Sequence, residues 1–533
     1  MATLNHPVSQ TRSFSTVFLI EMWERFGYYG MQALIIYYMV QRLGFQDTPA
    51  NLTWSAAAAL IYVSPAIGGW VGDKFFGTRH TMLLGTFVLA LGYALMVVPA
   101  HSSNFLFVAL GVIVVGNGLF KANAGNLVRK IYEGDDSKID SAFTYYYMAV
   151  NIGSTLSMLA TPVIKNYFNT PFDGQLTWLL GDNAAKLFGD GLGWHIAFAV
   201  CSVGLLVGLG NYAVMRHTLN HIGTEEDAKP MQLWKLLAVL AGGMVVVFLS
   251  TIILRYGTVA KAFVYVAGAC VLGIFAYLIS KSDVREKPGL AIALILVIET
   301  VFFFIFYQQM STSLNLFALR SVDPAFNVFG IHLWDWDPAQ FQAFNPIWIF
   351  ILSPILAITY TRLARRKRDF SIAAKFAFGF LAVALGFFIY GAAGHFAVAP
   401  GKTSSWVMVW GYGFASLGEL LTSGLGLAFV ARYVPARMGG FMMGAYYVAS
   451  GVAQYLGGIV ASFASVPATI TDPVQMMPIY TSLFNWLGAA GVGCTVIALA
   501  ALPLIRKLDA AHANGQVKLP VGAEGLPAVA SEQ

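Results

Sequence analysis

Long apolar segments dominate this chain of 533 residues and limit what it can fold into. Only 11% of the residues are charged, against about 25% in soluble proteins. Fourteen segments have about 20 residues, the length that an α-helix needs to cross the hydrocarbon core of a membrane. They lie near residues 15–41, 52–72, 81–99, 104–127, 141–164, 194–215, 233–254, 259–280, 289–313, 343–363, 372–394, 405–431, 439–463 and 478–505. The sequence therefore predicts an all-α membrane protein with fourteen transmembrane helices.

Basic residues alternate from one side of these segments to the other. The connections after the even-numbered segments are rich in lysine and arginine, as at Lys74 and Arg79 or in the run 362–368. The opposite connections hold few basic residues. By the positive-inside rule, both chain termini are predicted to be cytoplasmic. The net charge of +6 then reflects membrane topology, and we expect no nucleic-acid partner.

The segments are grouped as six, two and six. We expect a cytoplasmic tail over residues 1–14, a six-helix bundle over 15–215 and a second six-helix bundle over 289–505. Residues 216–288 form a linker with two inserted helices, which lack carboxylates and amides within their spans and are expected to face lipid. Residues 506–533 are predicted to be a disordered cytoplasmic tail.

The first span carries charges in its middle. Glu21, Glu24 and Arg25 stand among apolar and aromatic residues, where each ionised side chain costs roughly 2.5 to 3.5 kcal/mol. Glu21 and Arg25 recur at helical spacing with Tyr28 and Gln32, so this face must contact protein or water rather than lipid. These charges indicate either a functional site or a buried structural ion pair.

Other polar residues stand alone inside later spans. Lys121 lies within the fourth span and Glu419 within the twelfth. The alternatives to a functional role are a lysine that extends to the membrane interface and a glutamate that hydrogen-bonds between helices. Asn345 precedes a proline and could cap a helix. The three cysteines stand singly in apolar spans, so we expect no disulfide, metal site or cofactor.

Several motifs resemble one family. Residues 21–30 read Glu-Met-Trp-Glu-Arg-Phe-Gly-Tyr-Tyr-Gly and resemble the ExxERFxYYG signature of the proton-dependent oligopeptide transporter (POT) family, within the major facilitator superfamily. Residues 143–153 resemble its FYxxINxG signature. Residues 68–77, 116–123 and 418–420 resemble its loop after the second helix, its lysine-bearing fourth helix and its tenth-helix glutamate. The resemblance covers both six-helix halves, and the inserted pair is similar to that of bacterial members.

The resemblance implies uptake of di- and tripeptides with protons, by alternating access between two halves, in the inner membrane of a bacterium. Nothing in the sequence requires more than a monomer. No nucleophile with its base is visible, which argues against an enzyme, and the two-halves architecture argues against a channel. Transport of another small solute, such as nitrate, an amino acid or a peptide-like drug, remains the alternative.

A zwitterionic peptide needs a site with a positive end and a negative end. Arg25 and Lys121 are expected to bind the peptide carboxylate, and Glu419 the amine. Protonation of Glu21 or Glu24 is expected to release Arg25 and Lys121 for the peptide, because a buried carboxylate is charged more readily beside a cation. The resemblance assigns further substrate contacts to Tyr28, Tyr29, Gln32, Tyr62, Tyr147, Asn151, Gln308, Asn345, Tyr446 and Ser450.

Two positions depart together from the family pattern. Gln32 and Gln308 stand where many members have an arginine and a glutamate. Removing one partner of a buried ion pair strands a charge, whereas replacing both can be nearly neutral. We therefore expect the two amides to face each other and to hydrogen-bond. Tyr446 stands where many members have tryptophan, and Glu299 is the remaining acid on the helix of Gln308.

Overall fold

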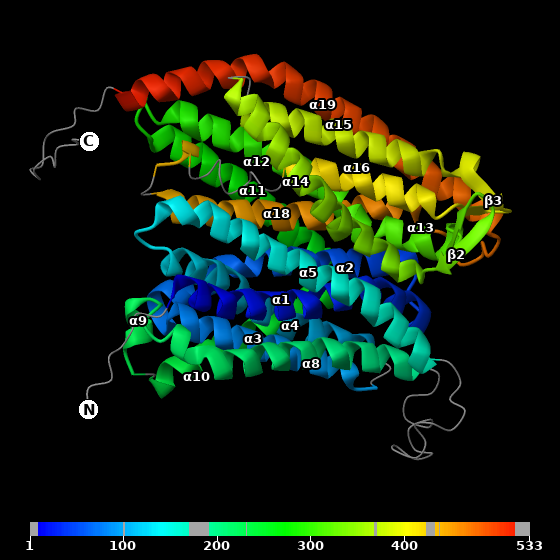
Figure 1. Ribbon diagram of the computed structural model, residues 1–533, viewed down its shortest axis with the longest axis horizontal. Coiled ribbons are helices and arrows are strands. Elements are labelled where there is room, and N and C mark those ends of the chain that lie inside the picture. Colours follow the sequence, from blue (N-terminus) through cyan, green and yellow to red (C-terminus); the bar gives the residue numbers. More distant parts are fainter. Residues whose placement is uncertain are drawn as a thin grey trace, which may run out of the picture.

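The computed structural model describes residues 9–99, 102–169, 191–230, 232–366, 370–422, 432–435 and 438–517. Fourteen long helices run through these residues, with axes roughly along one direction (Figure 1). Twelve spans satisfy the length and hydropathy expected of a membrane crossing. The other two helices are α1, which carries the charged cluster, and α16, of which 17 residues are described. The predicted all-α membrane fold is confirmed.

The first six long helices form the amino-terminal bundle. They are α1 (Gln10–Tyr37), α2 (Asp47–Trp70), α3 (Thr78–Val97), α4 (Ser103–Ile131), α5 (Asp136–Asn169) and α8 (Leu192–Met215). Short π-helical segments, Tyr38–Arg42 and Val71–Phe76, extend α1 and α2. Small residues allow close helix packing in a membrane. A Cβ on Gly68 of α2 would lie 1.8 Å from the carbonyl oxygen of Gly118 in α4, so these two backbones touch.

The last helices form the carboxy-terminal bundle. They are α12 (Lys287–Tyr307), α13 (Ser313–Ser321), α14 (Phe344–Arg365), α15 (Ile372–Gly391), α16 (Trp406–Thr422), α18 (Gly439–Ala461) and α19 (Pro473–Val517). A 3-10 segment, Gln308–Ser311, breaks one span into α12 and α13. Helix α2 of the first bundle packs along α18 of the second. The polar residues of both bundles can therefore meet between them.

Two short antiparallel sheets lie at one end of the molecule and were not predicted. Strand β1 (Ala325–Val328) pairs with β2 (Ile331–Asp335), and β3 (Ala397–Ala399) pairs with β4 (Lys402–Thr403). Helix α1 begins and α19 ends at the opposite end (Figure 1). We call these the strand end and the terminal end.

The two inserted helices, α10 (Leu233–Arg255) and α11 (Gly257–Lys281), follow the short linker helix α9 (Glu225–Ala228). Only 11% and 17% of the residues in their most apolar windows are buried, in keeping with the expected contact with lipid. The pair also spans the two bundles, because α10 packs on α4 and α2 whereas α11 packs on α18 and α12.

Two helices extend beyond the predicted boundaries of the bundles. Helix α1 already begins at Gln10, and α19 continues to Val517, so the expectation of disorder is wrong for residues 506–517. Tertiary contacts extend α19. Asp509 lies 3.8 Å from Arg432, and His512 packs against Tyr433. The rest of that tail, residues 518–533, lies outside the described residues.

Candidate functional site

The charges of α1 are buried together inside the amino-terminal bundle. Arg25 Nε lies 3.2 Å from Glu21 Oε1 and also pairs with Glu24. The exposed fractions are 2% for Glu21, 0% for Glu24 and 5% for Arg25. One guanidinium thus serves two carboxylates, because residues 21, 24 and 25 project from the same side of one helical turn. The site therefore has one more acid than its arginine alone can neutralise.

Tyr146 of α5 completes this cluster and was missed by sequence reasoning. Its hydroxyl donates to Glu21 Oε2 at 2.5 Å. The signal lay in three consecutive tyrosines, of which only Tyr147 was assigned a role. Tyr145 is exposed, whereas Tyr146 reaches Glu21. The direction of each hydroxyl depends on the rotation of α5, which the sequence does not give.

Lys121 of α4 lies over an aromatic ring and makes no ion pair with these carboxylates. Its Nζ lies 4.7 Å from the ring centre of Tyr62, and Arg25 lies 5.4 Å from the ring centre of Tyr28. Within the described residues, Lys121 forms no ion pair. A cation over an aromatic ring is held by the ring's quadrupole without being neutralised. The charge of Lys121 is therefore available for an anionic ligand.

Glu419 of α16 is the acid of the opposite bundle. It accepts a hydrogen bond from Asn345 Nδ2 at 2.7 Å and one from the Tyr147 hydroxyl at 3.4 Å. Asn345 Nδ2 also lies 3.1 Å from Ser416 Oγ. Asn345 therefore orients a carboxylate with its side chain. The bond from Tyr147 joins α5 of one bundle to α16 of the other.

A small cavity of about 20 Å³, room for about one water molecule in this conformation, lies between the bundles. Its lining contains five of the predicted residues, Tyr28, Tyr29, Gln32, Tyr62 and Gln308. It also contains residues that sequence reasoning missed, namely Trp54, Ala58, Tyr307, Met310, Ser311 and Gln454. The remaining predicted residues do not line it, although Tyr147, Asn345 and Glu419 contact one another as described above.

Gln454 differs from the other amides of the cavity. It is 1% exposed, and its Nε2 has no hydrogen-bond partner in the described part of the chain. A buried amide without a partner costs free energy unless something else satisfies it. Gln454 therefore provides an unused donor at the cavity.

The expected hydrogen bond between Gln32 and Gln308 is not formed. Gln32 Nε2 lies 3.4 Å from Gln342 Oε1, and Gln308 Nε2 donates to Ser55 Oγ at 3.0 Å. The 3-10 segment that begins at Gln308 ends the α-helix there, and Ser55 of α2 supplies a nearer acceptor. Both amides line the same cavity but bind different neighbours.

The side chains of two predicted residues, Ser450 and Asn151, make contacts within their own helices. Ser450 Oγ donates to the backbone carbonyl of Tyr446 at 2.9 Å, and Asn151 Nδ2 to that of Tyr147 at 2.8 Å. Serine and asparagine in helices often bond the carbonyl one turn earlier. Gln454, one turn beyond Ser450, reaches the cavity instead.

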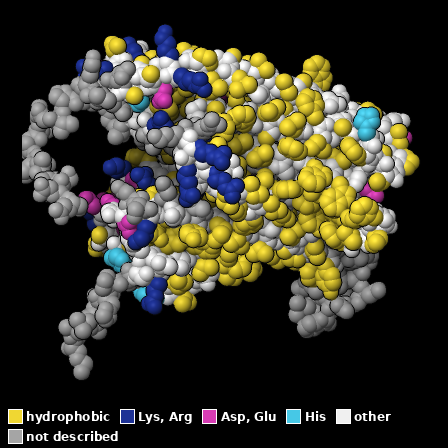
Figure 2. All heavy atoms as spheres, turned by 45° about the horizontal axis from the view of Figure 1, so that its top comes forward, with side chains coloured by type: hydrophobic (Ala, Val, Ile, Leu, Met, Phe, Trp, Pro, Cys, Tyr) yellow, Lys and Arg dark blue, Asp and Glu magenta, His cyan; other side chains and the backbone are white. Residues whose placement is uncertain are grey.

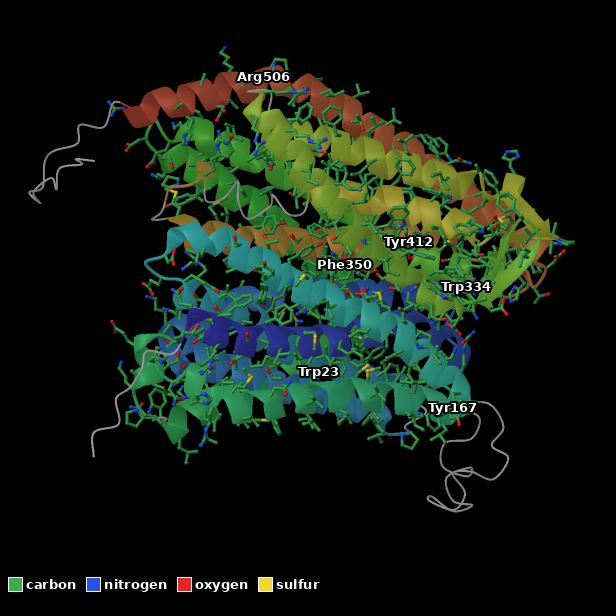
Figure 3. All side chains as sticks on the ribbon, viewed as in Figure 1. Trp23, Tyr167, Trp334, Phe350, Tyr412 and Arg506 are labelled. Atoms are coloured by element: carbon green, nitrogen blue, oxygen red, sulfur yellow. The ribbon has the colours of Figure 1, made fainter. Side chains whose placement is uncertain are left out.

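Polar contacts join the bundles at the strand end, where Tyr167 and Trp334 are labelled in Figure 3. Asp47 accepts two hydrogen bonds from Arg320, at 2.5 and 2.7 Å, and one from the backbone of Val466 at 2.9 Å. Asp337 lies 3.4 Å from Lys165. Figure 2 shows the surface indented at the terminal end, between the two groups of helices. The cavity is thus closed by polar contacts on the strand side.

The comparisons with known proteins agree with this architecture. A sequence model described as the POT family matches residues 79–480. The chain is 41% identical over 508 residues to the dipeptide and tripeptide permease B of Edwardsiella piscicida, covering 95% of this chain and 98% of that protein. It is 39% identical over 501 residues to the permease of the same name from Salmonella typhimurium, covering 94% and 96%.

Solved structures of peptide transporters are also similar to this chain. A crystal structure of tetrameric PepTSo2 is 62% identical, with a TM-score of 0.83 over 94% of this chain and 100% of that one. A peptide transporter POT in complex with sulfate is 28% identical, with a TM-score of 0.73 over 95% and 97%. These proteins are described as permeases and transporters. The chain therefore belongs to the POT family, a family of transporters rather than of enzymes, as the motifs of its helices predicted.

Proposed function

We propose that this protein imports di- and tripeptides together with protons across the inner membrane of a bacterium. The observation that carries the proposal is the placement of opposite charges on opposite bundles beside one tyrosine-lined cavity. Arg25 and Lys121 belong to the amino-terminal bundle, and Glu419 belongs to the carboxy-terminal bundle. A short peptide has a carboxylate and an ammonium at its two ends, so it would join the bundles by its charges.

The two ends of the peptide meet different surroundings in this proposal. Glu419, oriented by Asn345 and Tyr147, binds the ammonium. Lys121, held over Tyr62, binds the carboxylate. Tyrosine rings with hydroxyl tips accept apolar and polar side chains alike. The walls of the cavity therefore suit peptides of varied sequence.

Three amide side chains, from Gln32, Gln308 and Gln454, line the cavity between these charges. We assign them to the peptide backbone, whose N–H and C=O groups need both donors and acceptors. The unpaired Nε2 of Gln454 is the best placed, because binding a peptide carbonyl breaks no existing hydrogen bond. Positions 32 and 308 of this chain hold neutral amides, so the peptide carboxylate is left to Lys121 and Arg25.

Proton coupling is assigned to the cluster on α1. Arg25 is shared between Glu21 and Glu24, so a proton on either acid weakens its hold on the guanidinium. The freed guanidinium then binds the peptide carboxylate. Release of the peptide restores both pairs and expels the proton. This order links the two solutes through Arg25 without direct contact between them.

The direction of transport follows from the basic residues. The basic clusters lie at the terminal end, which the positive-inside rule assigns to the cytoplasm. The conformation described here is then closed toward the outside by the Asp47–Arg320 contact. Alternating access requires this contact to break when the bundles rock the other way.

Uptake into proteoliposomes tests the proposal. Labelled dialanine should accumulate when an inward proton gradient is imposed, and only equilibrate without one. Unlabelled trialanine should compete, whereas alanine and nitrate should not. Competition by nitrate or alanine instead of peptides would establish the alternative substrate class. Glu21→Gln and Glu24→Gln should abolish accumulation while peptide exchange continues, and full accumulation in both variants would remove the cluster from the coupling mechanism.

A further inference from the structure

An exposed apolar stripe runs along α14 and ends in arginines. Ile351, Ile355 and Ile358 are exposed by 47%, 54% and 52%, and their spacing places them on one helix face. Arg362 follows on the same face one turn later. Isoleucine side chains exposed at this depth contact lipid tails, because water would disfavour them. Phe350, labelled in Figure 3, lies near the other end of this stripe.

Arg362 and Arg365 lie in the last turn of this helix and Arg366 follows it directly, and all three residues are exposed. In the described part of the chain, their side chains form no ion pair and no hydrogen bond. On the neighbouring helix, Lys375 lies 4.3 Å from the ring centre of Tyr360 and adds a cation to the same region. Figure 2 shows Lys and Arg side chains gathered at the border of the apolar surface toward the terminal end.

The positive-inside rule explains why basic residues stand on this side of the membrane. It does not explain why three of them continue a lipid-facing stripe. From Ile351 to Arg362 the helix rises by about 16 Å, roughly half of a hydrocarbon core of about 30 Å. This is the depth of one leaflet. A lipid tail along the isoleucines would therefore place its headgroup at the arginines.

We infer that the terminal end of α14 binds an anionic phospholipid. Its phosphate is held by the guanidinium groups of Arg362, Arg365 and Arg366, and one acyl chain lies along the stripe of Ile351, Ile355 and Ile358. Guanidinium groups bind phosphate through paired N–H donors. A zwitterionic headgroup has the same phosphate but carries its own cation, so it should bind more weakly.

The test compares two triple variants of the whole protein. Arg362→Gln/Arg365→Gln/Arg366→Gln removes the proposed headgroup site. Lys74→Gln/Lys281→Gln/Arg285→Gln removes the same charge from exposed positions at the same end, away from the stripe. Purified, delipidated protein is titrated with short-chain phosphatidylglycerol, and with phosphatidylcholine or inorganic phosphate in parallel. Bound lipid is counted by native mass spectrometry at low and high salt.

The wild type and the control variant should bind phosphatidylglycerol in preference to phosphatidylcholine. The arginine variant should lose on the order of 100-fold in affinity for phosphatidylglycerol. High salt should abolish the preference of the wild type, and inorganic phosphate should compete weakly because it lacks the acyl chain. Equal losses in both variants, or equal binding of both lipids by the wild type, would overturn the inference. If the arginine variant unfolds, the salt titration of the wild type still tests whether the preference for phosphatidylglycerol is electrostatic.

Discussion

The contact between Asp47 and Arg320 should control how often the strand end opens. Asp47→Asn removes the charge that holds the guanidinium and weakens three hydrogen bonds at once. The two side chains belong to α2 and α13, one in each bundle. The substitution therefore destabilises only the state in which the strand end is closed, because the contact is absent when the bundles separate there.

The size of the effect follows from burial. The side chain of Asp47 is 2% exposed and that of Arg320 is 18% exposed. Removing one partner of a fully buried pair costs about 3–5 kcal/mol. Arg320 keeps a hydrogen bond to the Tyr480 hydroxyl at 2.9 Å and some access to water. We therefore expect Asp47→Asn to destabilise the closed state by about 2–3 kcal/mol. This lowers the ratio of closed to open molecules by roughly 30- to 150-fold.

Spin-label distance measurements can count the two states. Nitroxides at Tyr167 of α5 and Asp335 of β2 report on the strand end, after Cys270 and Cys494 are replaced by serine. Asp47→Asn should add a longer distance to the distribution in lipid nanodiscs. The double variant Asp47→Asn/Arg320→Gln should open less than the sum of the single variants, because it leaves no stranded guanidinium.

A matched control separates this contact from loss of charge in general. Asp135 pairs with Lys138 at 2.7 Å on an exposed surface of the amino-terminal bundle. Exposed pairs contribute about 0–1 kcal/mol, so Asp135→Asn should leave the distance distribution unchanged. An unchanged distribution in Asp47→Asn would refute the reasoning, and so would an equal change in Asp135→Asn.

Three further predictions concern single positions. Glu419→Gln should weaken binding of dialanine by roughly 10- to 150-fold, the range for a hydrogen bond to a charged group, and leave N-acetyl-dialanine unaffected in a competition assay. Tyr146→Phe should reduce proton-driven accumulation of peptide but spare exchange, whereas Tyr145→Phe, which alters an exposed ring, should change neither in the same vesicles. Gly68→Ala should lower stability by about 1–3 kcal/mol, because the added Cβ meets a carbonyl of α4, and Gly125→Ala, with no atom within 4 Å, should leave the thermal unfolding midpoint unchanged.

Much of the fold could be predicted because spanning helices have a fixed length and a plain apolar composition. The charged cluster of α1 was also predictable, since Glu21 and Arg25 are one turn apart on the same helix. The residues that line the cavity were harder to predict. Gln454 rather than Ser450 faces it, and this depends on the rotation of α18 against α2.

Tertiary contacts decided the remaining differences. Gln308 begins a 3-10 segment, and its amide binds Ser55 of another helix instead of Gln32. The extension of α19 depends on contacts such as that of Asp509 with Arg432, 77 residues earlier in the chain. Neither partner can be identified from local periodicity, because each lies far away along the chain.

The adjacent hydroxyls of Tyr146 and Tyr147 link any rotation of α5 to two different acids. The Tyr146 hydroxyl donates a hydrogen bond to Glu21 of its own bundle, and the Tyr147 hydroxyl donates one to Glu419 of the other bundle. Adjacent residues of a helix point about 100° apart, and a rigid helix cannot turn one without turning the other. A rotation of α5 that carries Tyr147 away from Glu419 therefore also moves Tyr146 against Glu21, so rotation of this helix, unlike a rigid separation of the bundles, changes both contacts together.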